Sequence, residues 1–501
     1  MAQKKVPDSI TLPWASDFHC HLRQGAMMET VTPMVEQGGV KTVLAMPNLT
    51  PPLTTTQMAI DYGKELQLLA PNVKFILTLY LNPALTPEEI KKAAEAGITA
   101  VKVYPSGVTT NSDWGVLDFK TYYTTFEAMQ SYNMILCLHG ECPSDAEKGI
   151  CILNAEERFL DTLRELHKSF PRLRIVLEHA TTKAAVDCVK SLGDTVGCTI
   201  TAHHLFITVD DWAGQPHHFC KPVAKFPSDR NALREIVTSG HPRFFLGSDS
   251  APHPRSAKQG ERPAAGVFTT PVLIPLVATL FERLGCLEKL EGFISTNGRN
   301  FYQLPLPTAA DGSITLVRST KLKVPSAYTV KGTGNGANNE PDTVVPFMAG
   351  SELAWSINID WRTFRYTSIG AHSATVSEAD VSSSMLTGES DSAGHFKGDA
   401  NIDNLTRNQC NVAITESNYY VGLDEEEFVD VATNKKKCNT CISIANPANG
   451  NKTIIAKVVG ISQGGTQKDI FLNQAALTEL AGKNIDYVYD ITWSYVDCPK
   501  A

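Results

Sequence analysis

Eight short apolar runs, rich in β-branched residues, recur between residues 15 and 255, and a helix-like segment follows each run. The runs are ASDFHCH, KTVLAMPN, KFILTLYL, ITAVKVYP, MILCLHG, RIVLEHA, GCTITAHH and RFFLGSDSAPH. In TPEEIKKAAEAG between two runs, Thr86 is a candidate N-cap, Glu89 closes a capping box and Gly97 ends the helix. Eight strand-plus-helix units over about 250 residues predict an α/β fold, a (β/α)8 TIM barrel with its site at the C-terminal strand ends.

An open, doubly wound sheet would fit the same alternation. The polar residues decide between the two folds, because most of the runs end in His, Lys, Asn or Asp. A closed barrel gathers such residues into one ring, whereas an open sheet has no reason to concentrate them. The pattern therefore favours the barrel.

The 501 residues exceed one ordinary domain, and the alternation fades after about residue 305. We expect the barrel domain to span residues 1–360, and a Ser/Thr/Gly-rich linker to span 361–394. Strand-like runs such as CISIAN and TIIAKVVG then predict a smaller, all-β domain over 395–501.

Charge and cysteine content exclude several classes of protein. The net charge of −8, without a Lys/Arg cluster or a Gly-rich phosphate loop, argues against nucleic acid as a partner. The N-terminus lacks the apolar core of a secretory signal, and no run reaches the roughly 18 apolar residues of a membrane span. We therefore expect a cytoplasmic protein without a membrane partner. Eight scattered cysteines suit a reduced compartment, whereas the last four resemble a disulfide framework: Cys410, Cys438, Cys441 and Cys498.

Histidines at several predicted strand ends indicate a metal centre. His19 and His21 alternate with Cys20, so a strand would point both imidazoles into the barrel. His139, His179 and Asp249 lie at further strand ends. This nitrogen and oxygen ligand set suits Zn²⁺, with Mn²⁺, Co²⁺ or Fe²⁺ as alternatives.

Lys102 is unusual because it lies inside an apolar strand, in AVKVYP. Burial lowers the pKa of a lysine, and a neutral amine can take up CO₂ to give an anionic carbamate that bridges two metals. A lysine that reaches solvent or pairs with a carboxylate is the alternative. The nearby histidines favour the carbamate.

Two such metals would activate water and polarise a carbonyl, which hydrolysis of an amide requires. Asp249 could bind one metal and carry the proton to the leaving nitrogen. The ligand set therefore predicts amide-bond chemistry.

Six motifs in this order resemble the dihydroorotase family, in the short form of the amidohydrolase superfamily: DFHCHLRQG, AMPN, VKVYPSGVTTNS, CLHGE, LEHATT and LGSDSAPH. The resemblance covers about residues 9–358. It implies a homodimeric binuclear zinc enzyme of pyrimidine (UMP) biosynthesis that reversibly cyclises N-carbamoyl-L-aspartate to L-dihydroorotate.

The resemblance also assigns residues. It implies one zinc held by His19, His21, Lys102 and Asp249, and a second by carboxylated Lys102, His139 and His179. The implied substrate contacts are His21, Arg23, Asn48, Thr109, Thr110, His139, Lys221, His253 and Ala265. Arg23, Asn48 and His253 would grip the free carboxylate, and Thr109 and Thr110 would lie on a mobile loop that closes over it. Six other residues are expected to be structural: His203, His204, His217, His218, Cys137 and Cys220.

The C-terminal segment resembles the double-psi β-barrel of expansin-like and barwin-like proteins over 395–499. Asp469 falls where those relatives carry an acidic residue in a polysaccharide groove. The usual Cys-rich motif is VVGISQGG here, so a disulfide is missing, and Cys438-x-x-Cys441 alone would also suit a zinc or redox pair. Either the fusion is genuine and the barrel is a binding module, or two adjacent reading frames have been joined.

Other functions remain as alternatives. A hydantoinase or allantoinase would share the metal chemistry, although such relatives place a β-sandwich portion before the first strand and have no need of an anion clamp. A catalytically inactive scaffold would have no need of Lys102. A third alternative assigns the function to the C-terminal barrel, as a binder of cell-wall polysaccharide.

Overall fold

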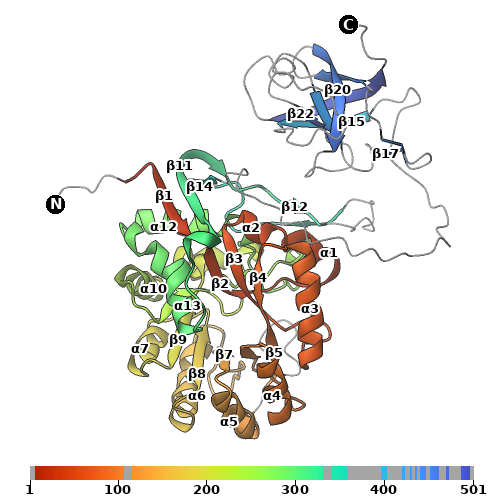
Figure 1. Cartoon of the computed structure of the whole chain (residues 1–501). Coiled ribbons are helices and arrows are strands. Elements are labelled where there is room, and N and C mark those ends of the chain that lie inside the picture. The colour runs from red at the N-terminus through yellow and green to blue at the C-terminus, as the bar shows by residue number, and fades with distance from the viewer. Residues whose placement is uncertain are drawn as a thin grey trace, which may run out of the picture. The chain divides into compact units, whose positions relative to one another are not determined.

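The computed structural model describes residues 6–106, 115–116, 118–330 and 341–358, and beyond them eight strands between residues 396 and 496 (Figure 1). The chain divides into two compact units, Met1–Thr367 and Ser368–Ala501. Thr109, Thr110, Asp469, Cys410, Cys438, Cys498 and the predicted linker 361–394 lie outside the described residues.

Parallel strands of the first unit form a barrel in chain order. They are β2 (Ala15–Cys20), β3 (Val40–Ala45), β4 (Lys74–Ile76), β5 (Thr78–Tyr80), β6 (Ala100–Val103), β7 (Ile135–His139), β8 (Arg174–Glu178), β9 (Val196–Ile200) and β10 (Phe244–Leu246). β4 and β5 are two halves of one predicted run, and they pair with β3 and β6, respectively. A parallel bridge between Cys20 and Ser250 brings the last strand back to the first. Each of the eight predicted runs therefore supplies one strand position of the barrel.

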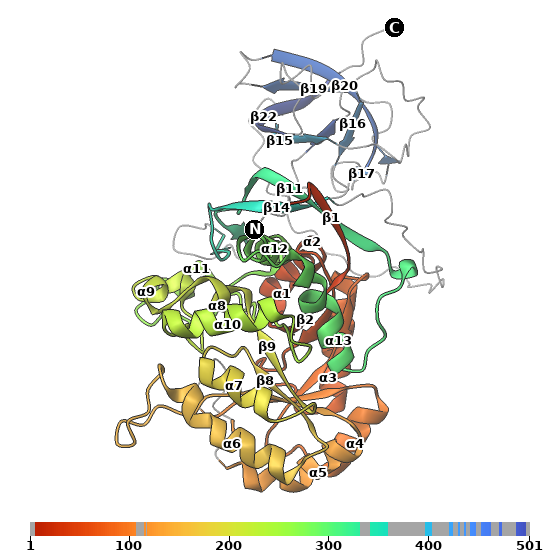
Figure 2. The ribbon, with the colours of Figure 1, turned by 90° about the vertical axis from the view of Figure 1, so that its left-hand side faces the viewer.

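Helices and short 3₁₀ or π turns follow the strands and cover the outside of the barrel (Figures 1 and 2). The α-helices are α1 (Gly25–Val31), α2 (Met34–Gln37), α3 (Thr56–Leu69), α4 (Pro87–Glu95), α5 (Tyr123–Ser131), α6 (Ala155–Ser169), α7 (Lys183–Ser191), α8 (Ala202–Phe206), α9 (Val209–Trp212), α10 (Pro227–Ser239), α11 (Arg255–Lys258), α12 (Leu273–Arg283) and α13 (Asn297–Phe301). The turns are η1 (Phe119–Tyr122), η2 (Pro216–His218), η3 (Thr270–Val272), η4 (Leu287–Lys289), η5 (Gly292–Thr296) and η6 (Ala309–Asp311). None of these described helices is long and apolar enough to cross a bilayer.

At the start of α4, the predicted N-cap is confirmed and the predicted capping box is wrong. Thr86 caps the helix by accepting from the Glu89 backbone N–H at 3.4 Å, as predicted. The capping box is wrong, because the Glu89 carboxylate accepts from the Thr56 N–H at 2.7 Å instead. That bond ties the first turn of α4 to the first turn of α3.

Apolar side chains fill the barrel below the polar strand ends. Phe18 from β2 stacks on Tyr302 with ring centroids 4.6 Å apart, and it meets Phe245 edge-on at 5.4 Å. Further members of this cluster are Leu44, Met46, Ile76, Ala100, Ile135, Cys137, Val176 and Phe301. The packed interior means that polar groups at the strand ends face only one open end of the barrel.

A three-stranded antiparallel sheet lies beside the barrel (Figure 2). Its order is β1 (Ser9–Pro13), β11 (Ser313–Lys323) and β14 (Glu352–Asn358), and a ribbon of β12 (Tyr328–Thr329) and β13 (Thr343–Val344) lies between the last two in sequence. β14 packs on α12, where the Ala354 N–H donates to the Thr279 hydroxyl at 3.1 Å. The sequence indicated that the alternation fades after about residue 305 but did not predict a strand there that pairs with the N-terminal strand.

Six strands of the second unit close into a small barrel in the order β15 (Phe396–Ile402), β21 (Ile470–Leu472), β16 (Tyr420–Leu423), β20 (Lys452–Ile461), β19 (Cys441–Asn446) and β22 (Tyr487–Val496). β17 (Val429–Asp430) and β18 (Lys435–Lys436) form a separate pair. Two of the barrel pairings are parallel and the others are antiparallel. Cys441 is disulfide-bonded. The predicted smaller β-barrel is therefore present, and its double-psi assignment stays a prediction.

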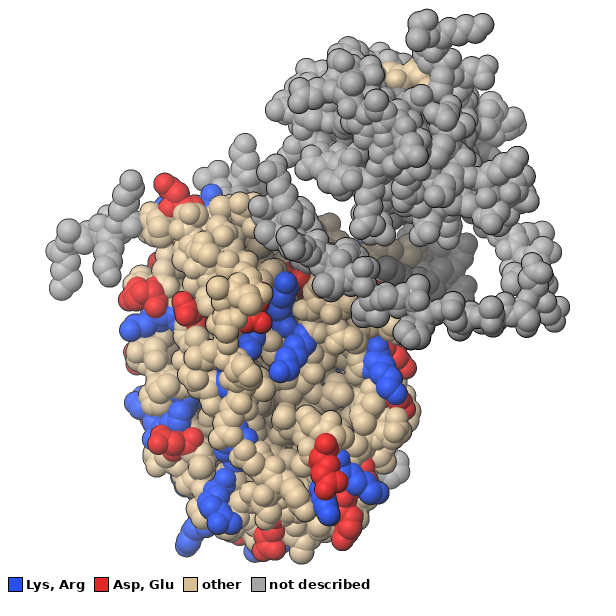
Figure 3. Space-filling model, in the orientation of Figure 1, with Lys and Arg blue, Asp and Glu red and all other residues tan. Residues whose placement is uncertain are grey.

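The visible face of the first unit carries acidic and basic side chains side by side, as Figure 3 shows. Neither sign forms a continuous field on that face.

Candidate metal centre and substrate pocket

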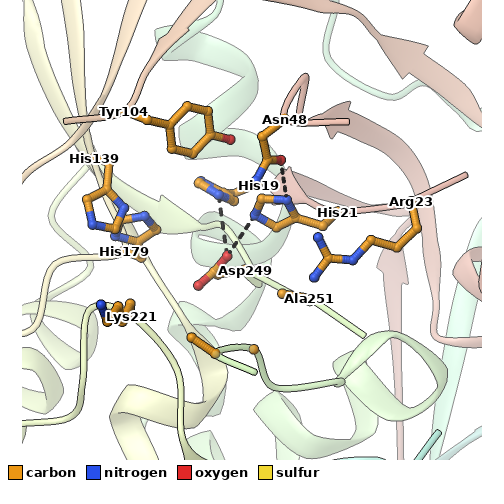
Figure 4. A pocket seen from close by; sticks show the side chains of 12 residues that line it. His19, His21, Arg23, Asn48, Tyr104, His139, His179, Lys221, Asp249 and Ala251 are labelled. Atoms are coloured by element: carbon orange, nitrogen blue, oxygen red, sulfur yellow. Dashed lines mark hydrogen bonds and ion pairs between the residues drawn. The ribbon is translucent and has the colours of Figure 1, made fainter. Parts of the chain in front are cut away.

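A small cavity opens at the C-terminal ends of the barrel strands (Figure 4). Its lining residues are His19, His21, Arg23, Asn48, Tyr104, His139, His179, Lys221, Asp249, Ala251, Ala265 and Gly266. Most of these residues were predicted from the sequence, and they come from strand ends and loops that are far apart along the chain. The closed barrel brings them to one place.

Three predicted ligands converge at the centre of this cavity. His21 Nε2 lies 3.1 Å and His19 Nε2 lies 3.4 Å from the same oxygen, Asp249 Oδ1. The three side chains are buried, and their donor atoms lie within 4.8 Å of one another. Such spacing suits three ligands of one metal ion.

Hydrogen bonds fix which nitrogen of each imidazole faces the centre. His19 Nδ1 donates to Glu178 Oε2, and His21 Nδ1 donates to Asn48 Oδ1, both at 2.8 Å. These bonds leave the two Nε2 atoms to face Asp249, as metal-binding histidines with oriented partners do.

His139 and His179 form the neighbouring wall. The centroids of their rings are 4.7 Å apart, and the His179 ring is 4.9 Å from that of His19. His139 Nε2 donates to Glu141 Oε2 at 2.8 Å, so its Nδ1 is the atom left for a metal. Burial lowers the pKa of both imidazoles, that of His179 strongly. Both rings therefore stay neutral, as a metal ligand must.

Lys102 lies in the interior of the barrel and is fully buried. Its Nζ has no hydrogen-bond partner in the part of the chain that the structure describes, and it lies 4.9 Å from the centroid of the Tyr104 ring. Burial lowers the pKa of this amine, although Glu178 and Asp249 oppose the effect. A buried amine without a partner is costly unless it is chemically converted. The full burial of Lys102 also excludes the alternative in which this side chain reaches solvent.

The charge of Asp249 is set by its neighbours. Burial alone would raise the pKa of this carboxyl, but the contact with His21 and the electrostatic effect of His19 and His21 outweigh burial and hold the pKa below its usual range. Asp249 is therefore a carboxylate at neutral pH, able to bind a cation or to accept a proton.

Three of the site residues have a left-handed backbone conformation. The φ angles are 63° at Arg23, 43° at His179 and 45° at Asp249. Residues other than glycine adopt this region at a cost of about 1–3 kcal/mol. Because each follows the end of a strand, the turn aims its side chain into the mouth of the barrel.

The predicted carboxylate clamp lies at one side of the cavity. Arg23 Nε donates to the Pro252 carbonyl at 3.0 Å, and its Nη2 lies 3.0 Å from His253 Nε2. Burial and the Arg23 charge lower the pKa of His253 to about 2, so the imidazole is neutral. His253 does not line the cavity itself, and Asn48 commits its Oδ1 to His21.

The donor set fits a binuclear metal centre. Three buried polar atoms of the predicted ligands lack a hydrogen-bond partner within the described residues, namely His19 Nε2, Lys102 Nζ and His179 Nδ1. Neutral imidazoles, a carboxylate and an amine that can be converted to a carbamate are the ligand types that Zn²⁺ and similar ions take.

Sequence reasoning missed the residues that hold the ligands. Glu178 and Glu141 orient His19 and His139, while Tyr104, Ala251 and Gly266 line the cavity. Only Glu178 and Glu141 carried a signal, because a carboxylate next to a predicted ligand histidine is a candidate partner for a ring N–H.

A second buried group, His203, His204 and Cys220, also brings donor atoms within 4.8 Å of one another. Cys220 Sγ and His204 Nε2 already bond the Pro222 carbonyl, at 3.2 and 3.0 Å. The positive charges of Lys225 and Lys258 act on this group as well. This surrounding disfavours a further cation, in agreement with the structural role predicted for these residues.

Known proteins are similar to this chain in sequence and in fold. Dihydroorotase from Mycosarcoma maydis is 52% identical over 386 residues, which cover 70% of this chain and 98% of that protein. Dihydroorotase from Saccharomyces cerevisiae is 44% identical over 363 residues, 70% of this chain and 98% of that protein. No family model matches the chain.

Solved structures give the same result. The structure of dihydroorotase in complex with 5-fluoroorotic acid from Saccharomyces cerevisiae superposes with a TM-score of 0.66 at 43% identity, covering 70% of this chain and 98% of that one. L-hydantoinase from Arthrobacter aurescens has a TM-score of 0.55 at 18% identity, covering 68% of this chain and 83% of that one, which shows a shared fold alone.

Proposed function

The chain belongs to the dihydroorotase family, and from this premise we propose that it reversibly cyclises N-carbamoyl-L-aspartate to L-dihydroorotate at the cavity described above. The observation that carries the proposal is the convergence of His19 and His21 on Asp249, where the buried amine of Lys102 acts electrostatically on His19 and Asp249 and Arg23 lines the same cavity. Metal ligands and an anion clamp share one cavity, which a cyclic amide with a free carboxylate requires.

Two zinc ions are the proposed cofactors. His19, His21, Lys102 and Asp249 would hold one ion, and Lys102, His139 and His179 would hold the other. When bound, such a pair activates water and polarises the substrate carbonyl. Support comes from the orphaned buried atoms His19 Nε2 and His179 Nδ1 and from the neutrality of the imidazoles.

Lys102 is proposed to carry a carboxyl group on Nζ. A neutral amine would add to CO₂ with loss of one proton to water, and the resulting carbamate anion would be stabilised by the two cations that the predicted ligands would hold. Support comes from the full burial of Lys102 and its depressed pKa. The carbamate would replace an uncompensated amine by a charge with two partners.

Asp249 is the proposed proton carrier. Its carboxylate stays ionised because the adjacent His21 and His19 side chains hold its pKa below the usual range, so it can accept a proton from the attacking water. The same Oδ atom would then deliver the proton to the ring nitrogen as the amide bond breaks.

Arg23 is proposed to bind the substrate's carboxylate, together with Asn48 and His253. A guanidinium held at Nε by the Pro252 carbonyl keeps its Nη atoms in a fixed plane, which suits an anion with two oxygens. His21, His139 and the residues Lys221 and Ala265 would contact the rest of the substrate, and Thr109 and Thr110 would close over it.

Turnover of L-dihydroorotate by the purified, zinc-loaded full chain tests the proposal. The matched competitor is hydantoin, a cyclic amide without the carboxylate. We expect hydrolysis of dihydroorotate with two metal ions per chain, and hydrolysis of hydantoin at least ~100-fold slower, because Arg23 then has no partner. Turnover of hydantoin alone would support a hydantoinase instead, and absence of bound metal would support an inactive scaffold.

Assembly, location and the second unit belong to the same proposal. Resemblance to the family supports a cytoplasmic homodimer, which light scattering of the full chain and imaging in the source cells test. Residues 1–360 are the proposed enzyme, 361–394 a linker and 395–501 a barrel that binds polysaccharide, with Asp469 in its groove. Failure of the full chain to bind any insoluble cell-wall glycan would remove the last assignment.

A further inference from the structure

Lys258, the last residue of α11, is a buried lysine that the proposed chemistry does not use. It is 3% exposed, and its Nζ donates to three backbone carbonyls: Phe219 at 2.9 Å, Ala264 at 2.8 Å and Gly266 at 2.7 Å. An ammonium has three protons, so each proton has its own acceptor. No ion pair links Lys258 to a carboxylate of the described residues.

The three carbonyls belong to two segments that line the pocket. Phe219 precedes Lys221, and Ala264 and Gly266 flank Ala265, so both segments place backbone at the cavity wall. Gly266 N–H also donates to the Phe219 carbonyl at 3.0 Å. Lys258 therefore lies at the junction of the two segments and contacts both.

The cavity wall is tight at this junction. A Cβ atom built at Gly266 would meet the Ala251 carbonyl oxygen, and it would come within 2.8 Å of His253 Cδ2. Ala265 O lies 3.0 Å from His253 Nε2, which in turn lies next to Arg23. A shift of residues 264–266 would therefore disturb the clamp as well as the wall.

The position of Lys258 is costly without these contacts. Burial lowers the pKa of its amine to about 8, and the Arg23 charge acts in the same direction. Carbonyl dipoles are the only described groups bonded to it, apart from a long contact of 5.9 Å to the Phe219 ring. The presence of an ammonium at this costly position indicates that it holds the bound backbone segments in place.

We propose that Lys258 is a positioning residue that holds the backbone at Lys221 and Ala265 in the spacing that the substrate ring requires. The inference rests on the proposed function. Lys258 does not touch the reacting atoms, so it sets the affinity for substrate and leaves the metal centre and the chemical step largely unchanged.

The variant Lys258→Met tests this role, because it keeps the length and burial of the side chain and removes all three donors. We expect KM for dihydroorotate to rise roughly ten- to hundredfold, since small misplacements of substrate contacts have such effects. We expect kcat and metal content to change less than about twofold. Lys258→Arg keeps donors and charge and should recover most of the affinity. Arg255→Met removes an exposed charge from the same short helix and is the matched control.

Direct binding of 5-fluoroorotic acid, measured by calorimetry, is the second readout and does not depend on turnover. We expect affinity in Lys258→Met to fall by the same factor as KM rises. Unchanged KM and affinity in a folded, metal-loaded Lys258→Met protein would overturn the inference. Joint loss of kcat and metal would also overturn it, because Lys258 would then support the metal centre.

The two proposals fail in different ways. If the wild-type chain binds 5-fluoroorotic acid but does not turn over dihydroorotate, the proposed function fails and the binding comparison still decides the role of Lys258. If the wild-type chain neither binds nor turns over these compounds, both proposals fail.

Discussion

His21 Nδ1 donates to Asn48 Oδ1 at 2.8 Å, while its Nε2 lies 3.1 Å from Asp249 Oδ1. The Asn48 amide oxygen therefore fixes the ring orientation of a predicted metal ligand. This relationship adds a second task to a residue that the sequence predicted only as a substrate contact.

Asn48→Ala should weaken metal binding by about 10–100-fold, because it removes the acceptor that orients His21. Asn48→Asp keeps an acceptor at the same place and should retain metal. The added negative charge should still raise KM for an anionic substrate. Metal titration and steady-state kinetics separate the two effects; equal metal affinity in Asn48→Ala and wild type would contradict the orienting role.

Lys102→Ala should lose both bound metal and activity, because it removes the proposed bridge between two metal positions. Metal analysis after gel filtration and the dihydroorotate assay measure the two losses. Lys190→Ala, an exposed lysine on α7, is the control and should match wild type. Full activity in Lys102→Ala would exclude the bridge.

Arg23→Gln should raise KM for dihydroorotate by roughly 10–100-fold, since a hydrogen bond to a charged group contributes about 1.5–3 kcal/mol. Metal content should stay at the wild-type value because Arg23 contacts Pro252 and His253 but none of the proposed metal ligands. The exposed Arg158→Gln serves for comparison. A variant with normal KM would assign the carboxylate to another residue.

Glu156→Ala should lower the free energy of unfolding of the barrel by roughly 2–4 kcal/mol. Its buried carboxylate accepts from the backbone N–H groups of Thr181 and Thr182 at 2.8–3.1 Å, and from both hydroxyl groups. These bonds hold the turn that follows His179. Denaturant unfolding compares this variant with Glu157→Ala, its exposed neighbour, which should remain near wild type.

Ending the chain after residue 360 should leave dihydroorotate hydrolysis and metal content unchanged. Every described site residue lies before that point, and the last strand of the first unit, β14, ends at Asn358. Kinetics of the truncated and full chains make the comparison. A marked loss of kcat in a folded, metal-loaded truncation would assign the second unit a part in catalysis.

The barrel was predictable because its signals are local. Each strand is a run of apolar residues, each helix carries its own start and stop, and polar residues in apolar strands mark the ring at the barrel mouth. His19, His139, His179, Asp249 and Lys102 were named on that basis, and the structure brings them together.

Local reasoning was insufficient where the backbone departs from regular geometry. The pairing of β2 with β3 shifts in register between Asp17 and Cys20, so Phe18 packs in the barrel interior while the next residue, His19, reaches the metal cavity. Positive φ at His179 likewise turns it into the mouth directly after Glu178, which also faces inward. Strict alternation would have placed the two residues of each pair, Phe18 and His19 or Glu178 and His179, on opposite faces of the strand.

The sequence by itself determined the fold class, the ligand types and the family, because these depend on residue identity and short-range spacing. Only the tertiary structure decided which atoms face the centre. Glu178 is 159 positions from His19, and Lys258 lies 39 positions from Phe219. Such partners meet because the strands pair into a barrel, and no periodicity along the chain encodes their contact.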